Sequence, residues 1–428
     1  MHPNVNFIYI DPGTGSMLFT ILIGVLSAAA YFLRNLFMKL RFIFSLGKQE
    51  TIDSNHIPFA IFTDSKRYWN LFKPICDELE KRGQKAVYLT ASPDDPALGE
   101  DYQFVSTEFI GEGNKAFARM NMLKADIVLS STPGVDVYQW KRSRDVKWYA
   151  HILHAANDVT AYRMFGIDYY DTVMTSGDYQ VKQVRQLEEL RHLPEKEVPL
   201  IGLPHMDALR ERLLASEPLP DHPVTVLLAP SWGPSSILNK FGTGMINALL
   251  KTGYHIIIRP HPQSFTSEAK MLDALMSAYP DSEDLEWDRS NDNFEALRRS
   301  DILISDYSGV IFDFALVFDR PIIYADTSFD KGPYDAWWLE NEMWTFSVLP
   351  KIGRQLTSDN FINVGELIDN CLNAKELEDG RNQARSETWA NIGHSSELAV
   401  DYLIKKREEL LSCKDDQTTS KDTANIIV

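Results

Sequence analysis

A strand, a tight turn, a helix and a second strand follow one another between Ser300 and Ala325, and this unit fixes the class of fold. Residues 301–305, Asp-Ile-Leu-Ile-Ser, form a short apolar run typical of a strand buried in a parallel sheet. Residues 310–318 are mostly apolar at helical spacing, and Asp-Arg-Pro ends them before the strand 322–324. Strands alternating with helices in this way predict an α/β protein.

Small and polar residues fill the turn between the first strand and the helix of this unit. They are Ser305, Asp306, Ser308 and Gly309. A helix that begins among small residues exposes unpaired backbone N–H groups, and such groups bind phosphate. The turn therefore indicates a phosphate site, and an ordinary capped turn without a ligand is the alternative.

A second buried strand ends about 40 residues earlier, where residues 254–258 lead into Arg259-Pro260-His261-Pro262. Ligands in open α/β sheets bind at the C-terminal ends of strands. The two prolines restrict the backbone on either side of His261 and hold its imidazole in place. Together with the first turn, this pattern favours a functional histidine over a structural one.

Composition excludes some classes of protein. The formal net charge of -17 and the pI of about 5.1 argue against nucleic acid as a partner, because such binders present basic surfaces. The three cysteines, Cys76, Cys371 and Cys413, are too far apart in sequence for a metal motif or a disulfide framework. No Asp-x-Asp motif is present, so we expect no protein-ligated metal and no cofactor.

The N-terminal segment 1–50 predicts a membrane anchor with a juxtamembrane stretch. Residues 17–33 are nearly continuous apolar sequence, which is long enough to cross a bilayer as a helix. Lys and Arg occur only after this run, so the positive-inside rule places the rest of the chain in the cytoplasm. A cleaved signal peptide is the alternative, although the basic residues that normally precede its apolar core are missing.

Beyond the anchor, strands and helices alternate in two similar stretches separated by the proline-rich linker 217–223, and the first stretch begins with a predicted strand at 58–63 and ends with one at 198–201. We expect an N-terminal α/β domain over 55–216 and a C-terminal α/β domain over 222–380. A C-terminal helix over 381–412 is predicted to pack across both domains, and the polar tail 413–428 is predicted to be disordered. The fold class is thus α/β, with two Rossmann-like domains behind a transmembrane helix.

Several blocks of this chain resemble the CDP-glycerol glycerophosphotransferases of teichoic-acid-type polymer synthesis. The resemblance spans roughly residues 148–374 and rests on His154, Gly202-Leu-Pro204 with Asp207, Ala229-Pro-Ser-Trp232, Arg259-Pro-His261-Pro, Ser305-Asp-Tyr-Ser308 with Asp313, and Lys331-Gly-Pro-Tyr334. Three positions depart from the usual family pattern: Ala155 replaces Gly, His205 replaces Arg, and Gly309 replaces Ser. The donor side therefore matches the family better than the acceptor side.

The resemblance implies a GT-B fold, with the acceptor side on domain 55–216 and the nucleotide donor bound by domain 222–380. It also implies a transferase that moves glycerol phosphate, or a related phosphopolyol, from a CDP-linked donor such as CDP-glycerol. The acceptor is expected to be a hydroxyl of a lipid-linked or cell-surface polymer precursor, and CMP is expected to leave. Such a reaction needs a base for the hydroxyl proton and groups that hold the pyrophosphate.

His154, at the end of the predicted strand 146–153, is expected to be the base, and His261 is expected to act on the donor phosphates. The other predicted donor-binding residues are Arg259, Ser305, Asp306, Ser308, Gly309, Asp313 and Trp232. Structural roles remain open for several of them: Arg259 can form a salt bridge, Asp313 can cap a loop, and Trp232 can belong to the core.

Two further functions remain open. A GT-B glycosyltransferase or an epimerase relative would use a sugar nucleotide on the same fold, and a membrane-tethered binding module would not catalyse at all. The expected location is the inner membrane, with a single crossing and the catalytic part in the cytoplasm. An anchor suits a lipid-borne acceptor, because both partners are then confined to one plane.

Overall fold

The computed structural model describes residues 56–290, 292–306, 308–325 and 331–424, with side chains up to residue 412. The predicted membrane anchor, 1–50, lies outside these residues. Within the described part of the chain, no helix is both long and apolar enough to cross a membrane.

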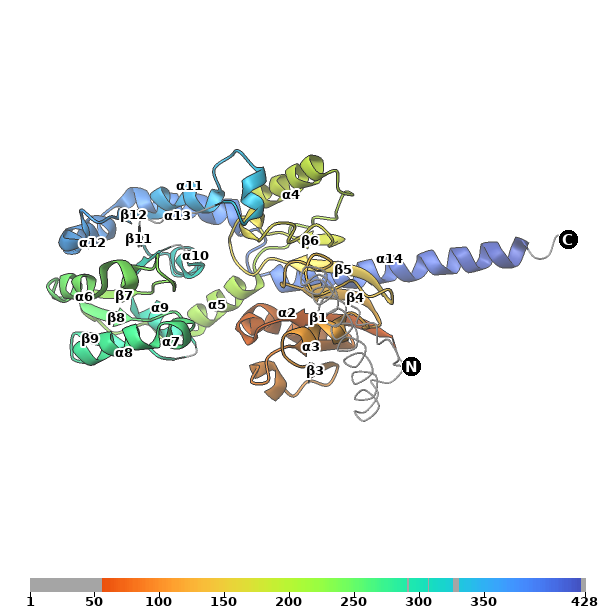
Figure 1. Cartoon of the computed structure of the whole chain (residues 1–428), viewed down its shortest axis with the longest axis horizontal. Coiled ribbons are helices and arrows are strands. Elements are labelled where there is room, and N and C mark those ends of the chain that lie inside the picture. The colour runs from red at the N-terminus through yellow and green to blue at the C-terminus, as the bar shows by residue number, and fades with distance from the viewer. Residues whose placement is uncertain (1–55, 291, 307, 326–330, 425–428) are drawn as a thin grey trace, which may run out of the picture. The chain divides into compact units, whose positions relative to one another are not determined.

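A six-stranded parallel sheet forms the first α/β unit, in the order β3-β2-β1-β4-β5-β6 (Figure 1). Its strands are β1 Ile57–Thr63, β2 Ala86–Thr90, β3 Val105–Phe109, β4 Ala125–Ser130, β5 Val146–Ile152 and β6 Thr172–Met174. Its main helices are α2 Trp69–Lys81, α3 Asn114–Met120 and α4 Asp178–Arg191.

A second six-stranded parallel sheet follows, in the order β12-β11-β10-β7-β8-β9. Its strands are β7 Thr225–Leu228, β8 His255–Ile258, β9 Leu285–Trp287, β10 Ile302–Ser305, β11 Ile322–Ala325 and β12 Gly353–Leu356. Its helices are α6 Ile237–Leu250, α7 Ser264–Ser267, α8 Ala269–Ala278, α9 Phe294–Arg299, α10 Val310–Phe312, α11 Trp344–Ile352 and α12 Val364–Leu372. The predicted pair of Rossmann-like sheets is therefore present.

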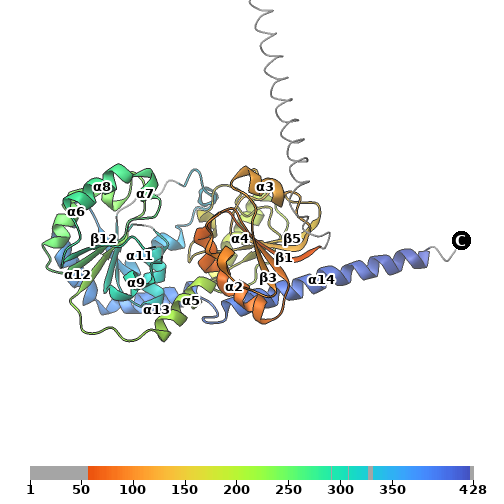
Figure 2. The ribbon, with the colours of Figure 1, turned by 90° about the horizontal axis from the view of Figure 1, so that it is seen from below.

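Alternate residues of the central strands pack against opposite layers of helices. Val226 and Leu228 of β7 lie in the cluster that includes α6, α8 and α12, whereas Leu227 lies in the cluster with α9, α10 and α11. Figure 2 shows α6 and α8 on one side of this sheet and α9 and α11 on the other. A strand covered on both faces must be apolar at every position, which is why these strands were readable from the sequence.

Both sheets have a point at which the strand order reverses, and this point decides where a ligand can bind. In the second sheet β7 lies beside β8 on one edge and beside β10 on the other. In the first sheet β1 lies between β2 and β4. The turns after β7, β10 and β1 therefore occupy the positions where open α/β sheets bind their ligands.

Strand prediction failed at three places. The strands β3 and β12 were not predicted, because Val105–Phe109 and Gly353–Leu356 are polar at alternate or adjacent positions. The run 198–201, predicted as a strand, makes only isolated bridges beside β6, such as Thr175 to Leu200. Each error lies at the edge of a sheet, where burial on one side is lost and the apolar signal weakens.

The predicted C-terminal helix is two helices, α13 Lys375–Thr388 and α14 Ser395–Ala424. Asp207, on α5 Pro204–Ala215, explains the break, because its carboxylate accepts hydrogen bonds from Trp389 Nε1 at 2.9 Å and from the N–H groups of Gly393 and Ser395 at 2.8 and 2.9 Å. A carboxylate at this place satisfies the first N–H groups of α14. The helix α14 also continues to Ala424, into the tail predicted to be disordered.

Candidate active site

His154 follows β5 and is half-buried in a cluster of aromatic rings. The ring of Tyr68 meets it edge-on, with centroids 5.1 Å apart. The hydroxyl of Tyr162 lies 3.4 Å from its Nδ1. The opposite nitrogen, Nε2, has no hydrogen-bond partner among the residues that the structure describes, so it is available to a substrate.

Burial lowers the pKa of His154 to about 4. Electrostatic interaction with His205 and Arg67 also lowers this pKa, whereas Asp313 raises it. His154 is therefore neutral at pH 7 and can accept a proton. A neutral imidazole is the form that a general base requires.

Asp313, which follows β10 and α10 of the second unit, contacts His205. In the sequence, His205 stood out only as a departure from the family pattern. The Oδ1 of Asp313 lies 3.1 Å from His205 Nε2, at the start of α5. Asp313 also begins a single π-helical turn, Asp313–Val317, which continues α10. Such turns are frequent at functional sites because they redirect a side chain out of the regular helix.

The turn after β10 lies against the residue that follows His154. A Cβ atom added to Gly309 would be 3.7 Å from the Cβ atom of Ala155, which is ordinary van der Waals contact. Two of the three departures from the family pattern therefore face each other. The candidate phosphate turn of the second sheet and the candidate base of the first sheet meet at this contact.

His261 is half-buried after β8, and a backbone contact fixes its protonation pattern. The N–H of Gln263 donates to His261 Nδ1 at 3.1 Å, so the proton of the neutral ring lies on Nε2. Burial lowers the pKa of His261, and Arg67 lowers it further, while Glu268 acts in the opposite direction. His261 can thus donate one hydrogen bond to a phosphate without carrying a charge.

Arg67 is a site residue that the sequence reading missed. It follows β1, is exposed, and holds its guanidinium 4.9 Å from the centroid of the Tyr68 ring. It lowers the pKa of both His154 and His261, so its charge acts on both halves of the site. Arg67 has no carboxylate within ion-pair distance in the described part of the chain. The strand-end rule that selected His261 would also have selected Arg67, which follows the predicted strand 58–63.

Arg259 serves the architecture of the second sheet. It forms an ion pair with Asp288 and donates from Nη2 to the carbonyl of Ser290 at 3.0 Å. The salt bridge therefore joins the end of β8 to the chain after β9, which steadies the loop that carries His261.

Ser305 and Asp306 hold the turn after β7. Ser305 is fully buried, and its hydroxyl donates to the carbonyl of Ala229 at 2.6 Å. The carboxylate of Asp306 accepts from the N–H of Ser231 at 2.8 Å, and burial raises the pKa of Asp306. Both side chains thus connect the neighbouring turns at the point where the strand order reverses.

The remaining predicted donor residues lie on the surface of these turns. Trp232 is 51% exposed, so it does not belong to the core. The Ser308 hydroxyl has no hydrogen-bond partner within the described residues, which leaves it free for a ligand. Tyr307, between the two serines of the block, is outside the described residues.

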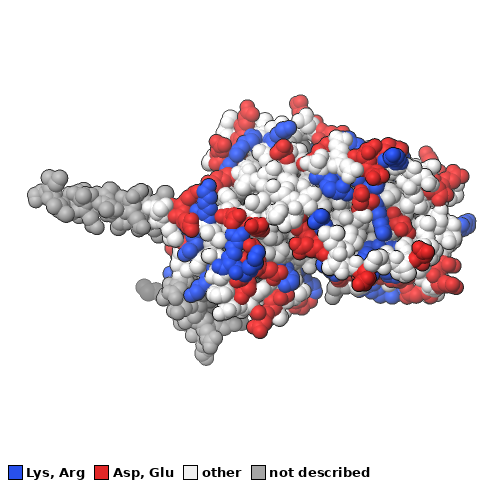
Figure 3. Space-filling model, turned by 180° about the vertical axis from the view of Figure 1, so that it is seen from behind, with Lys and Arg blue, Asp and Glu red and all other residues white. Residues whose placement is uncertain are grey.

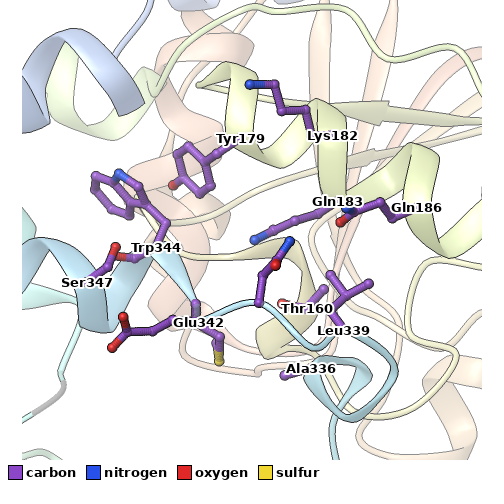
Figure 4. Close-up of a pocket in the computed structure, with 12 residues that line it drawn as sticks. Thr160, Tyr179, Lys182, Gln183, Gln186, Ala336, Leu339, Glu342, Trp344 and Ser347 are labelled. Atoms are coloured by element: carbon purple, nitrogen blue, oxygen red, sulfur yellow. The ribbon is translucent and has the colours of Figure 1, made fainter.

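A cavity of about 270 Å³ lies between α4 and the start of α11 (Figure 4). Its wall includes Tyr179 and Trp344, whose rings stack with centroids 4.6 Å apart, together with Gln183, Gln186 and Lys182. It contains none of the predicted site residues. Among the described residues, no group of three or more His, Cys, Asp or Glu side chains is placed to hold a metal ion.

Comparison with known proteins agrees with the resemblance seen in the sequence. The family model described as CDP-Glycerol:Poly(glycerophosphate) glycerophosphotransferase matches residues 44–336. No curated protein sequence matches the chain.

Solved structures of similar fold include two variants of the wall teichoic acid polymerase TagF. One, soaked with CDPG, has a TM-score of 0.58 and 16% identity, covering 91% of this chain and 99% of that chain. The other has a TM-score of 0.59 and 15% identity, and the match covers 90% of this chain and 98% of that chain. The UDP-GlcNAc 2-epimerase of Methanocaldococcus jannaschii, in complex with UDP-GlcNAc and UDP, has a TM-score of 0.53 and 14% identity, covering 81% and 99%. At these identities the likeness shows the fold alone, a pair of Rossmann-like domains of GT-B type.

Proposed function

The chain belongs to the CDP-glycerol:poly(glycerophosphate) glycerophosphotransferase family, and on that premise we propose a specific reaction for it. It transfers glycerol phosphate, or a related phosphopolyol, from a CDP-linked donor to a hydroxyl of a lipid-linked or cell-surface polymer precursor. The observation that carries this proposal is the contact between Gly309 of the second sheet and Ala155, next to His154, of the first. It brings a turn suited to phosphate and a neutral histidine to one place.

His154 is the base of the proposed reaction. Its Nε2 takes the proton of the acceptor hydroxyl while the oxygen attacks the phosphorus atom that bears the glycerol. A new P–O bond forms, the P–O bond to CMP breaks, and CMP leaves with the electron pair. Asp313 favours the cation that forms on His154, since it raises the pKa of that residue.

The donor pyrophosphate lies between His261, Arg67 and the turn that carries Ser308 and Gly309. The Nε2–H of His261 and the guanidinium of Arg67 stabilise the charge that develops on the phosphate oxygens. Ser308 offers a free hydroxyl, and Trp232 an exposed ring for the nucleotide. Arg259, Ser305 and Asp306 keep these turns in place through the contacts described above.

A membrane location completes the proposal. The segment 1–50 anchors the chain to the inner membrane by one helix and leaves the catalytic part in the cytoplasm, beside a lipid-linked acceptor. The apolar run 17–33, followed by basic residues, supports this assignment. Full-length protein should sediment with the membrane fraction and resist extraction by salt or alkali. Release by salt alone would contradict the anchor.

The first experiment measures which nucleotide the full-length protein releases in the presence of a membrane extract. It is incubated with CDP-glycerol, CDP-ribitol or a UDP-sugar, and CMP and UDP are quantified. We expect CMP release, lost in His154→Gln and His261→Ala. The matched control is His255→Ala, which changes a histidine at the opposite end of the same strand, β8.

The other outcomes separate the alternatives. Release of UDP alone would support a sugar-nucleotide glycosyltransferase or epimerase relative and overturn the proposed donor. Tight binding of nucleotide without any release would favour a membrane-tethered binding module.

A further inference from the structure

The hydroxyl of Tyr162 lies between two histidines, and the proposed reaction uses only one of them. It is 3.0 Å from His151 Nε2 and 3.4 Å from His154 Nδ1. His151 belongs to β5, is fully buried, and packs against the rings of Tyr162 and Tyr170 with centroids 5.1 and 4.9 Å away. The three residues therefore form a chain that begins inside the first sheet's core and ends at the candidate base.

We propose that His151 and Tyr162 are positioning residues that keep the lone pair of His154 on Nε2. In this arrangement Tyr162 accepts the Nδ1–H of His154 and donates its own hydrogen to His151 Nε2. The inference rests on the proposed function, because it concerns the proton that His154 takes from the acceptor. It assigns a role to two residues outside the predicted site.

The protonated state of His154 fixes which atoms donate and which accept in the hydrogen bonds from His154 through Tyr162 to His151. Once Nε2 has taken the proton of the acceptor, both ring nitrogens carry hydrogen, and Nδ1–H needs an acceptor atom. Within the described residues the oxygen of Tyr162 is the acceptor in reach, and its O–H is then free to point at His151. The transferred proton remains on His154 Nε2, so no proton is passed on to Tyr162 or His151.

Burial keeps the two positioning residues neutral. It lowers the pKa of His151 to about 3 and raises the pKa of Tyr162 well above its usual value. Neither group therefore ionises at neutral pH, and the positive charge stays on His154, where Asp313 favours it. His151 and Tyr162 can therefore orient the ring of His154, but they do not take the proton of the acceptor in its place.

The proposed arrangement has a cost at one buried atom. In this arrangement the remaining proton of His151 lies on Nδ1, which has no hydrogen-bond partner among the described residues. Leaving a buried donor unpaired is unfavourable, and such groups in native proteins call for a reason. Selecting the tautomer of a catalytic histidine is such a reason.

The segment around Asp335, between β11 and α11 of the second unit, holds Tyr162 in place. The N–H of Asp335 donates to the carbonyl of Tyr162 at 2.8 Å, and Arg163 pairs with Tyr334 as an isolated antiparallel bridge. The position of the hydroxyl between the two histidines is thus set by both halves of the fold.

Steady-state kinetics of the full-length protein test the proposal. Tyr162→Phe should lower kcat about 10- to 100-fold, part of what general base catalysis supplies, and leave KM for the CDP-linked donor within about twofold. His151→Leu should act in the same way, and His151→Gln should restore most of kcat, because an amide can accept from Tyr162. Tyr170→Phe is the matched control: it also contacts His151, but its hydroxyl donates to the carbonyl of Thr132 at 2.5 Å.

A spectroscopic readout separates this inference from the proposed function. Protein with ¹⁵N-labelled histidine is examined at pH 7, and His154→Gln assigns the ring signals of His154. We expect a protonated Nδ1 and an unprotonated Nε2, and we expect Tyr162→Phe to shift His154 toward the Nε2–H form that free histidine prefers. Unchanged His154 shifts in Tyr162→Phe would overturn the proposal, whether or not the enzyme releases CMP. Equal losses of kcat in Tyr162→Phe and Tyr170→Phe would also overturn it.

Discussion

Among the residues of the candidate site, one exposed arginine acts electrostatically on both His154 and His261. Arg67 lowers the pKa of both His154 and His261, and no carboxylate of the described chain neutralises it. A cation in such a place is suited to the negative charge of a pyrophosphate, which would draw it toward the donor. In the sequence, the sign of this role is that Arg67 follows the predicted strand 58–63, although exposed arginines are common on any surface.

We predict that Arg67→Gln weakens use of the CDP-linked donor by about 10- to 100-fold in kcat/KM, the effect of losing one charged hydrogen bond. The measurement is CMP release at varied donor concentration. Lys66→Gln is the control, because Lys66 is the exposed neighbour and pairs with Asp94. Equal losses in both variants would show that Arg67 acts only through general surface charge.

The pH dependence of the reaction should report His154. Because the base must be neutral, kcat/KM should fall on the acid side with a pKa near 4 rather than near 6.5. Asp313→Asn removes the charge that raises this pKa, so the acid limb should move to lower pH. The check is a pH–rate profile of both proteins, and a limb near 6.5 in the parent would argue against His154 as the base.

At the scale of elements, the segment that leads to α11 fastens the second α/β unit to the first. Asp335 is fully buried and forms an ion pair with Arg191, and its Oδ1 accepts from the N–H of Phe165 at 2.8 Å. The guanidinium of Arg191 also lies over the rings of Phe165 and Trp338. This network surrounds the loop that carries Tyr162, so it supports the site as well as the fold.

Breaking this network should be costly. Asp335→Ala should lower the free energy of unfolding by about 3–5 kcal/mol, because it leaves the buried charge of Arg191 partly unpaired. Asp94→Ala, which removes the exposed partner of Lys66, should change the free energy of unfolding far less, because water and salt screen an exposed ion pair. Urea unfolding of the two variants provides the comparison, and similar midpoints would contradict a structural role for Asp335.

At the scale of the whole molecule, buried neutral histidines make stability depend on pH. Figure 3 shows acidic and basic side chains mixed across the described part of one face, and the formal net charge of -17 is spread over the chain. The inward-facing histidines behave differently. His151 and His154 have folded-state pKa values lowered to about 3 and about 4, so the unfolded chain binds their protons first as pH falls.

The free energy of unfolding should therefore fall as pH decreases from about 6.5 toward 5, by up to about 1.4 kcal/mol per pH unit for each of these histidines. The contribution is fully present above pH 6.5 and is lost as pH falls through the lowered pKa values. His151→Gln should reduce the slope, and His222→Gln, an exposed control, should leave it unchanged. Urea unfolding at several pH values tests this, and a flat profile in the parent would contradict it.

The architecture and the blocks that carry the candidate site were readable from local patterns along the chain. Strands such as Ile256–Ile258 are apolar at every position because helices cover both faces, and this pattern is local enough to read. The rule that ligands bind at strand ends then selected His154, His261 and Gly309, and the resemblance added Asp313. In the structure Gly309 lies beside Ala155, Asp313 raises the pKa of His154, and Arg67 lowers the pKa of both histidines. The edge strands β3 and β12 and the break before α14 were not predicted, because they depend on contacts with residues far away in the sequence.

Contacts between distant parts of the chain separate the side chains that bond to the protein from those that stay open to solvent. The hydroxyl of Ser305 and the carboxylate of Asp306 reach the turn after β7 because β10 and β7 pair in one register. Arg259 pairs with Asp288 for the same reason, on the neighbouring strand. Tyr162 comes between two histidines because the chain around Asp335 docks on its loop. Such contacts join residues far apart in the chain, and spacing along the sequence carries no record of them.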